Sequence, residues 1–122
     1  MSGRAPKTKG SRYELELAKH LSDTLGIPVA RTSLTQQVFN RRQGNCDLIG
    51  LPGLSPECKR VEALNVRAAL RQATANATPS TIPVVITRRN RETTGSSMVA
   101  LTLDDFLPLY RAWLLQQGYL NG

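Results

Sequence analysis

Stretches with a helical spacing of apolar residues alternate with short apolar runs along the chain. Helical spacing extends from Ser11 to Leu25, from about Leu64 to Ala77, and again after Thr102. Strand-like runs cover residues 28–35, 46–51, 57–60, 82–87 and 98–101. The predicted order of elements, α-β-β-β-α-β-β-α, favours an α/β fold in which a mixed central sheet is flanked by helices.

Capping signals mark the ends of the first and last helices. Ser11 can cap the first helix, with Glu14 three residues further on, and Gly26 ends it. Thr102 and Asp105 form a capping box for the last helix.

Large apolar side chains repeat in this last helix at a period of about 3.6 residues. They include Phe106, Leu109, Tyr110, Trp113 and Leu114. We therefore expect the helix to dock on the core, with its aromatic residues serving as core or dimer contacts before base-stacking platforms.

The chain has 122 residues, which suits one domain. Residues 1–10 are polar and basic and are expected to form a flexible arm, followed by a single domain over 11–122. The absence of a membrane-spanning stretch and of a secretion signal favours a cytoplasmic protein. Cys46 and Cys58 are then expected to be reduced thiols buried beneath the sheet, since their spacing to His20 does not suit zinc.

Basic residues outnumber acidic ones, with 16 Lys+Arg against 9 Asp+Glu and a net charge of +7. This excess suits a polyanion such as DNA, although a soluble basic domain with solvated charges is the alternative. The expected DNA-binding side chains are Lys7, Lys9, Arg12, Arg31, Arg41, Arg42, Arg60, Arg88, Arg89 and Arg91.

Two carboxylates and an ammonium group occur close together in the stretch GNCDLIGLPGLSPECKR. Asp47 lies in an apolar run, a Pro52–Gly53 turn follows, and Glu57 and Lys59 are two residues apart. Because side chains in a strand alternate between faces, Glu57 and Lys59 point the same way. We expect the three groups to converge at one end of a hairpin, where they are equipped to hold a divalent cation and to activate a water molecule.

Further motifs surround this stretch in a fixed order. KGSRYELE contains Glu14, VARTS contains Arg31, NCD contains Asp47, ECK contains Glu57 and Lys59, and LRQA contains Gln72. With these motifs the chain resembles the PD-(D/E)XK nuclease superfamily, and within it the archaeal-type and phage Holliday junction resolvases. The resemblance covers about Lys9 to Arg91, and it departs from the family where Cys46 replaces the proline that often precedes the aspartate.

The resemblance implies a restriction-endonuclease-like αβββαβ core with an extra C-terminal strand and helix. It implies that Mg²⁺, or Mn²⁺ in its place, is bound by Asp47, Glu57 and the backbone carbonyl of Cys58, with Glu14 reaching a second metal or its water shell. Lys59 would position or deprotonate the attacking water. Arg31 would bind the phosphate of the scissile strand, and Gln72 would complete the catalytic set.

The function expected from this resemblance is Mg²⁺-dependent endodeoxyribonuclease activity on four-way (Holliday) junctions, in a prokaryotic or phage-infected cell. Paired nicks require two active sites, so a homodimer is expected, with the hairpin or the last helix as its interface. The alternatives are a nuclease of the same fold acting on flap, single-stranded or duplex DNA, a non-catalytic DNA-binding module, and a basic protein-interaction module.

Each site residue also has a structural explanation. Glu14 could be the capping-box partner of Ser11, and Gln72 a polar residue on a helix edge. Glu57 and Lys59 could form only a surface ion pair. Glu16 is expected to be solvated and His20 to lie on a helix surface.

Overall fold

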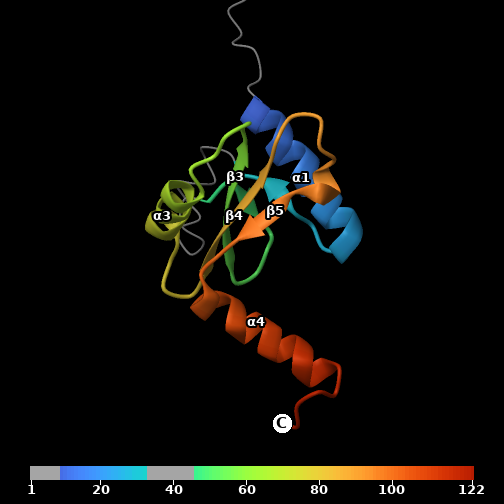
Figure 1. Ribbon diagram of the computed structural model, residues 1–122. Coiled ribbons are helices and arrows are strands. Elements are labelled where there is room, and N and C mark those ends of the chain that lie inside the picture. The colour runs from blue at the N-terminus through green and yellow to red at the C-terminus, as the bar shows by residue number, and fades with distance from the viewer. Residues whose placement is uncertain (1–8, 33–45) are drawn as a thin grey trace, which may run out of the picture.

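Figure 1 shows the computed structural model of the protein, which describes residues 9–32 and 46–122. Its elements, in order, are α1 (Lys9–Leu25), β1 (Ala30–Arg31), β2 (Leu48–Ile49), β3 (Leu54–Arg60), α3 (Val66–Asn76), β4 (Ile82–Arg88), the 3-10 helix η2 (Thr94–Ser96), β5 (Met98–Ala100) and α4 (Leu103–Gln116). This order confirms the predicted alternation of helices and strands, with η2 as an addition.

The strands form two small sheets in place of the single mixed sheet that was predicted. In the larger sheet β3 pairs with β4 in parallel, from Leu54 opposite Ile82 to Arg60 opposite Arg88, and β5 is antiparallel to β4. The strands β1 and β2 form a separate antiparallel pair. The mixed character is therefore confirmed for the three-stranded sheet alone.

Prolines occur in both long strands without interrupting the ladder. The N–H of Ile82 donates to the carbonyl of Gly53, so the backbone N–H and C=O groups of even-numbered residues in β4 point toward β3. The backbone nitrogen of Pro83 therefore points to the β5 side, where pairing begins only at Val85. The backbone nitrogen and carbonyl of Pro56 likewise point away from β4, because this carbonyl accepts from the N–H of Asp47. Neither proline removes a ladder hydrogen bond, which explains why they are tolerated here.

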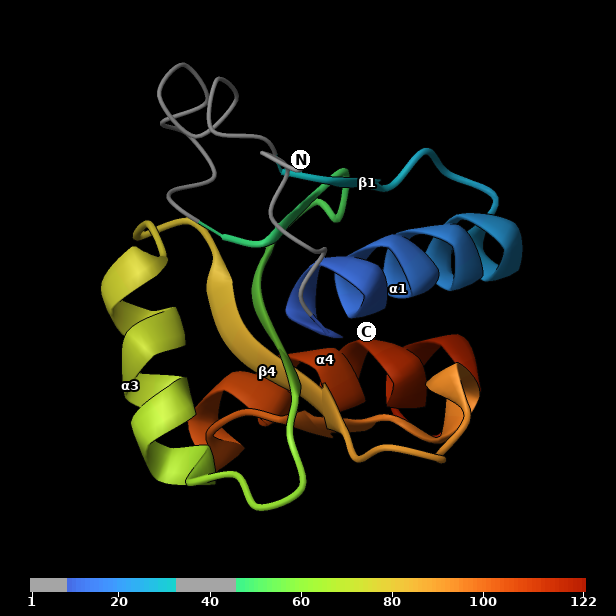
Figure 2. The same cartoon turned by 90° about the horizontal axis from the view of Figure 1, so that it is seen from above.

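Two helices cover opposite faces of the three-stranded sheet (Figure 2). On the α1 face, the core consists of Tyr13, Leu17, Ala18, Val29, Leu48, Leu51, Cys58, Val84 and Ile86. On the α3 face, Val85 packs with Ala69 and Ala73. Cys46 and Cys58 are buried free thiols, as predicted.

Several element boundaries differ from the prediction. The first helix begins at Lys9, so Lys9 and Gly10 belong to α1 and not to the arm. Ser11 consequently lies inside the first turn and is not the helix cap. The predicted strand over 28–35 is reduced to Ala30–Arg31 in the described part of the chain, while residues 33–45 and 1–8 lie outside it.

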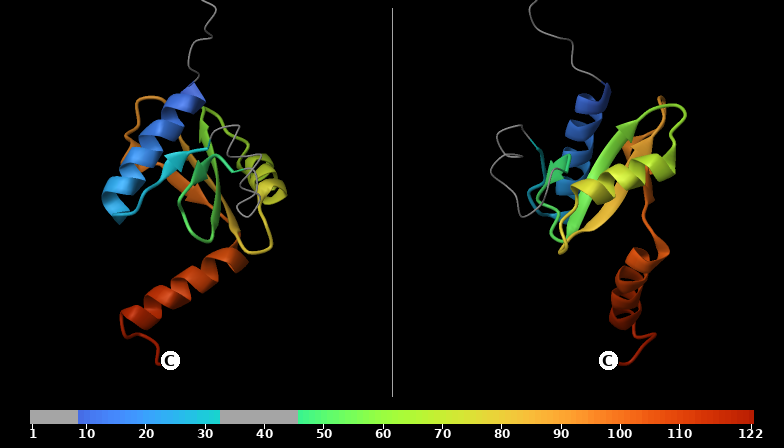
Figure 3. Two further views of the ribbon diagram at one scale, coloured as in Figure 1. Left: turned by 180° about the vertical axis from the view of Figure 1, so that it is seen from behind. Right: turned by 90° about the vertical axis from the view of Figure 1, so that its left-hand side faces the viewer.

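The last helix does not dock on the core, and this prediction is wrong. It begins as predicted, with the hydroxyl of Thr102 accepting from the N–H of Asp105 at 3.2 Å. It contains no buried residue, and it extends away from the layers formed by α1, the sheet and α3 (Figures 1 and 3). Neither core cluster contains a residue of α4, because its large apolar side chains remain exposed.

In the described ranges, none of the helices has the length and apolar character needed to cross a membrane.

Candidate active site

Three carboxylates from three different parts of the chain gather around Cys58. Glu14 comes from α1, Asp47 directly precedes β2, and Glu57 is the neighbour of Cys58 on β3. The pKa of the Cys58 thiol is raised by burial and then by the negative charges of Asp47, Glu14 and Glu57. Residues far apart in the sequence therefore share one electrostatic environment, as the motif order predicted.

Asp47 is held in place by hydrogen bonds of both its backbone and its side chain. Its N–H donates to the carbonyl of Pro56 at 3.0 Å, and its carbonyl accepts from the N–H of Thr32 at 2.9 Å. Its Oδ2 accepts from the N–H of Cys58 at 2.7 Å. Burial raises the pKa of Asp47, and the Cys58 N–H, Lys59 and Arg31 partly oppose this shift.

The backbone of Cys58 also bears on the site. Within a strand, the N–H and C=O of one residue point to the same side. Because the Cys58 N–H points to Asp47, its carbonyl oxygen also faces away from β4, on the side of Asp47. This carbonyl therefore lies on the same side of β3 as the Asp47 carboxylate.

Glu57 is the most deeply buried of the three acids, with 4% of the residue exposed. Burial, and next the charge of Asp47, raise its pKa to about 6. Lys59 Nζ lies 3.7 Å from Glu57 Oε1, and the ammonium of Lys59 and the side chain of Asn76 on α3 both oppose the upward shift of the Glu57 pKa. The alternative of a mere surface ion pair is wrong, because the carboxylate is buried.

Glu14 is paired with Arg31 of β1. The Arg31 Nε donates to Glu14 Oε1 at 2.7 Å, and Nη2 donates to the Ser11 hydroxyl at 3.0 Å. The pKa of Glu14 is raised by burial, lowered by the Arg31 hydrogen bond, and raised again by Asp47. The structure therefore supports a position near the other acids and rejects the capping-box explanation, since Ser11 is no cap.

Gln72 is exposed on α3, and no hydrogen bond joins it to the acids in the described part of the chain. Asn76, one helical turn further on, is the α3 side chain that lowers the pKa of Glu57. The sequence carried a signal for this residue, because positions four apart lie on one helix face.

Arg88 and Glu16 form an ion pair that the sequence did not suggest. Arg88 Nη2 lies 2.8 Å from Glu16 Oε2, and the guanidinium carbon lies 5.3 Å from the centre of the Tyr13 ring. The hydrogen bond from Arg88 lowers the pKa of Glu16. Arg88 is only 7% exposed, so it ties β4 to α1 and does not form part of a DNA surface; Glu16 is not simply solvated.

The other basic residues are distributed over several surfaces. Arg12 and Arg91 are exposed, Arg89 pairs with Glu92, and Arg60 donates to Asn90 at 3.1 Å. Two exposed arginines of α3, Arg67 and Arg71, were not predicted as DNA contacts. Lys7, Arg41, Arg42 and the side chain of Lys9 lie outside the described residues.

The acids can provide two ligands for a metal ion, but not a complete set of side chains. Among the residues with described positions, no three His, Cys, Asp or Glu side chains form a group that could hold a metal ion. Mg²⁺ keeps several waters and is commonly bound through one or two carboxylates. Asp47, Glu57 and the Cys58 carbonyl fit this pattern, whereas Glu14 is already engaged by Arg31.

The chain matches no model of a known protein family, no curated protein and no solved structure. Its functional assignment therefore depends on the residues of the site.

Proposed function

We propose that this protein is a Mg²⁺-dependent endonuclease of the PD-(D/E)XK type that hydrolyses phosphodiester bonds in branched DNA as a homodimer. The observation that carries the proposal is that burial and then Asp47, which accepts from the N–H of Cys58, raise the pKa values of both Glu14 and Glu57, with Lys59 3.7 Å from Glu57. A group of buried carboxylates with raised pKa values is costly to the fold, and such groups are concentrated at functional sites.

The raised pKa values support a cationic ligand for Asp47 and Glu57. Each carboxylate is partly desolvated, and the charge of Asp47 raises the pKa of Glu57. A divalent cation between them would remove this repulsion. When bound, Mg²⁺ would neutralise charge on the phosphate and lower the pKa of a water molecule.

Lys59 and Arg31 supply positive charge on either side of the acids. The Lys59 side chain is about one-third exposed, which leaves its ammonium accessible to a phosphate or a water molecule while it contacts Glu57. The Arg31 side chain is 42% exposed and presents a planar group suited to bidentate phosphate contacts. We assign Lys59 to the attacking water and Arg31 to the scissile phosphate.

DNA is the proposed substrate because of the net charge of +7 and the exposed arginines. The four-way junction and the homodimer enter the proposal from the resemblance. Flap, single-stranded and duplex DNA are the competing substrates.

The proposal is tested by incubating the wild-type protein, Asp47→Asn and Glu57→Gln with four-way junction, flap, duplex and single-stranded DNA in Mg²⁺ or Mn²⁺. We expect the wild type to cleave the junction. Each variant should lose at least about 100-fold in cleavage rate, because each lacks one of the two carboxylates proposed to bind the metal ion that stabilises the transition-state charge. Junction binding should be largely retained. Asp23→Asn, the same change on the exposed side of α1, should cleave as the wild type does.

A second readout does not depend on cleavage. Mg²⁺ should raise the melting temperature of the wild type and of Asp23→Asn, but not that of Asp47→Asn. Preference for another DNA would change only the assigned substrate. A wild type that binds DNA but cleaves none with either metal would be a non-catalytic binding module, and the proposal would be rejected.

A further inference from the structure

The helix α4 has the composition of a buried element, yet its large apolar side chains are exposed. Those of the helix and the residues after it are Leu103, Phe106, Leu107, Leu109, Tyr110, Trp113, Leu115, Tyr119 and Leu120. At about 100° per residue, they leave two gaps around the helix, one at Asp105, Ala112 and Gln116 and a narrower one at Asp104 and Arg111. A helix with this much exposed apolar surface is ordinarily covered.

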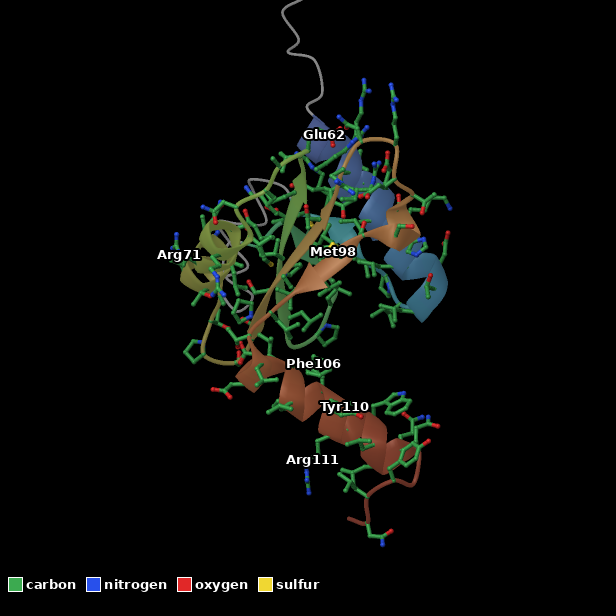
Figure 4. All side chains as sticks on the ribbon, viewed as in Figure 1. Glu62, Arg71, Met98, Phe106, Tyr110 and Arg111 are labelled. Carbon is green, nitrogen blue, oxygen red and sulfur yellow. The ribbon has the colours of Figure 1, made fainter. Side chains whose placement is uncertain are left out.

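Two surfaces of α4 can be distinguished. Phe106, Tyr110 and Trp113 stack in sequence, with ring centres 5.7 and 6.1 Å apart. Figure 4 shows Phe106 on the side of the helix toward the rest of the domain, whereas Arg111 points away from it.

The surface that includes Arg111 has a groove of about 600 Å³, which we call the outer groove. Its lining comes from the apolar Leu107, Pro108, Leu114 and Leu120, from Tyr110, which belongs to the aromatic stack as well, and from the charged Asp104 and Arg111.

The two charges of the outer groove have no partners within the molecule. Neither Asp104 nor Arg111 forms an ion pair with any residue whose position is described. They are seven residues apart, or about 10 Å along the helix, which is too far for an ion pair between them. Asp104 and Arg111 lie at equal distances on either side of a point between Leu107 and Pro108. The groove is therefore complementary to a second copy of itself that runs in the opposite direction.

This charge pattern fits a second copy of the chain. If two α4 helices cross antiparallel near Leu107 and Pro108, Asp104 of each copy faces the partner's Arg111. The contact is then repeated by the two-fold axis, as an isologous interface requires. DNA is a poor occupant, because α4 carries two acids, Asp104 and Asp105, and one base, Arg111, in a chain whose net charge is +7.

We propose that the outer groove of α4 is a homodimer interface in which two α4 helices pack antiparallel, with Leu107 and Pro108 at the centre and a reciprocal Asp104–Arg111 ion pair on either side of it. This inference rests on the proposed function, which includes a homodimer, and it adds the surface through which the two copies bind. That surface lies on α4 itself, so a failure of the interface and a failure of catalysis are separable.

The test is sedimentation velocity of the full chain over a range of concentrations. The wild type should be a dimer. Asp104→Arg and Arg111→Asp should each weaken dimerisation by at least about 10-fold, since each places like charges in both of these contacts between the copies. The double variant, Asp104→Arg with Arg111→Asp, should dimerise again. Asp105→Arg, the same change on the polar side of α4, should behave as the wild type does.

Mixing the two single variants is the most specific arm. In an antiparallel pair, Asp104→Arg on one copy and Arg111→Asp on the other make both charged contacts attractive. The mixture should therefore form dimers that contain one copy of each variant, whereas each variant alone should remain largely monomeric.

A monomeric wild type overturns the proposal, and so does a dimer that the single variants leave intact or that mixing does not restore. If the wild type is monomeric and binds anionic vesicles through α4, the helix is a lipid-binding element instead. Loss of DNA cleavage with the dimer intact would count only against the catalytic proposal.

Discussion

At the scale of single residues, the site is defined by charges placed where solvent is scarce. Glu57 is 4% exposed, and its neighbours include another carboxylate, Asp47. Lys59 and Asn76 offset only part of this cost, since the pKa of Glu57 stays raised at about 6. A cation bound by ionised Glu57 would offset this cost, which is why the raised pKa supports the proposed metal site.

The pKa of Glu57 leads to a prediction about stability. A pKa raised from 4.5 to about 6 favours the folded state while Glu57 is protonated, and this contribution is lost as the pH rises from 4.5 through 6. Glu57→Gln should therefore be more stable than the wild type at pH 8, by roughly 1–2 kcal/mol, with the difference shrinking to near zero at about pH 4.5.

Urea unfolding of both proteins in metal-free buffer across this pH range measures the effect. Asp23→Asn on the exposed side of α1 serves as the control and should show no such trend. A Glu57→Gln protein that is less stable than the wild type at pH 8 would mean that the Lys59 and Asn76 contacts outweigh the burial.

At the scale of elements, the site depends on how β1, β2 and β3 meet. Asp47 is bonded through its backbone to Thr32 on one side and to Pro56 on the other. The chain then turns at Gly50, which has a φ of +98° and lies against Pro28 and Val29. Because Gly50 directly follows β2, this turn leads the chain from β2 toward β3, whose Cys58 N–H donates to the Asp47 carboxylate.

Gly50→Ala should disrupt this meeting of strands. A Cβ at position 50 would overlap the carbonyl oxygen of Pro28 and lie 3.1 Å from Val29 Cα, in addition to the strain of the positive φ. We expect a loss of about 3 kcal/mol or more in the free energy of unfolding. Thermal and urea unfolding measure this loss.

Gly53→Ala provides the matched comparison. Gly53 also has a positive φ, +83°, but a Cβ there would meet nothing within 4 Å. Gly53→Ala should lower the free energy of unfolding by only about 1 kcal/mol, which is the cost of the backbone strain alone. Equal losses at both positions would show that the close approach of Pro28 to Gly50 is unimportant.

At the scale of the whole molecule, a packed body is followed by a helix that adds nothing to its core. The body consists of α1, the strands and α3, and its core clusters contain no residue of α4. The site lies in this body, whereas the largest exposed apolar surface lies on α4.

A chain ending at Thr102 should therefore remain folded. At concentrations where the full chain is monomeric, the loss of residues 103–122 should change the free energy of unfolding by less than about 1 kcal/mol, because no buried apolar area is removed. Circular dichroism is the suitable probe, since the single tryptophan, Trp113, is lost with α4. Leu17→Ala, in the core, should cost about 2–5 kcal/mol by comparison. Loss of cooperative unfolding in the shortened chain would contradict this division of the molecule.

Much of the architecture was predictable because it is encoded locally. Helical and strand periodicity, the Gly26 stop and the Thr102 cap depend on neighbours within a few residues, and the order of elements followed from them. The proximity of Glu14, Asp47 and Glu57 was predictable from the order of their motifs. Residues 33–45 and their Arg41 and Arg42 are not described by the structure, so predictions there stay predictions.

By itself, therefore, the sequence determined the elements, the buried thiols and the members of the acid cluster. Only the tertiary structure decided that Arg88 is buried against Glu16 and Tyr13, that Asn76 and not Gln72 affects the pKa of Glu57, and that α4 stays outside the core. The physical reason is that burial and charge pairing depend on which elements meet. An apolar helix face has the same period whether it meets its own core or another molecule.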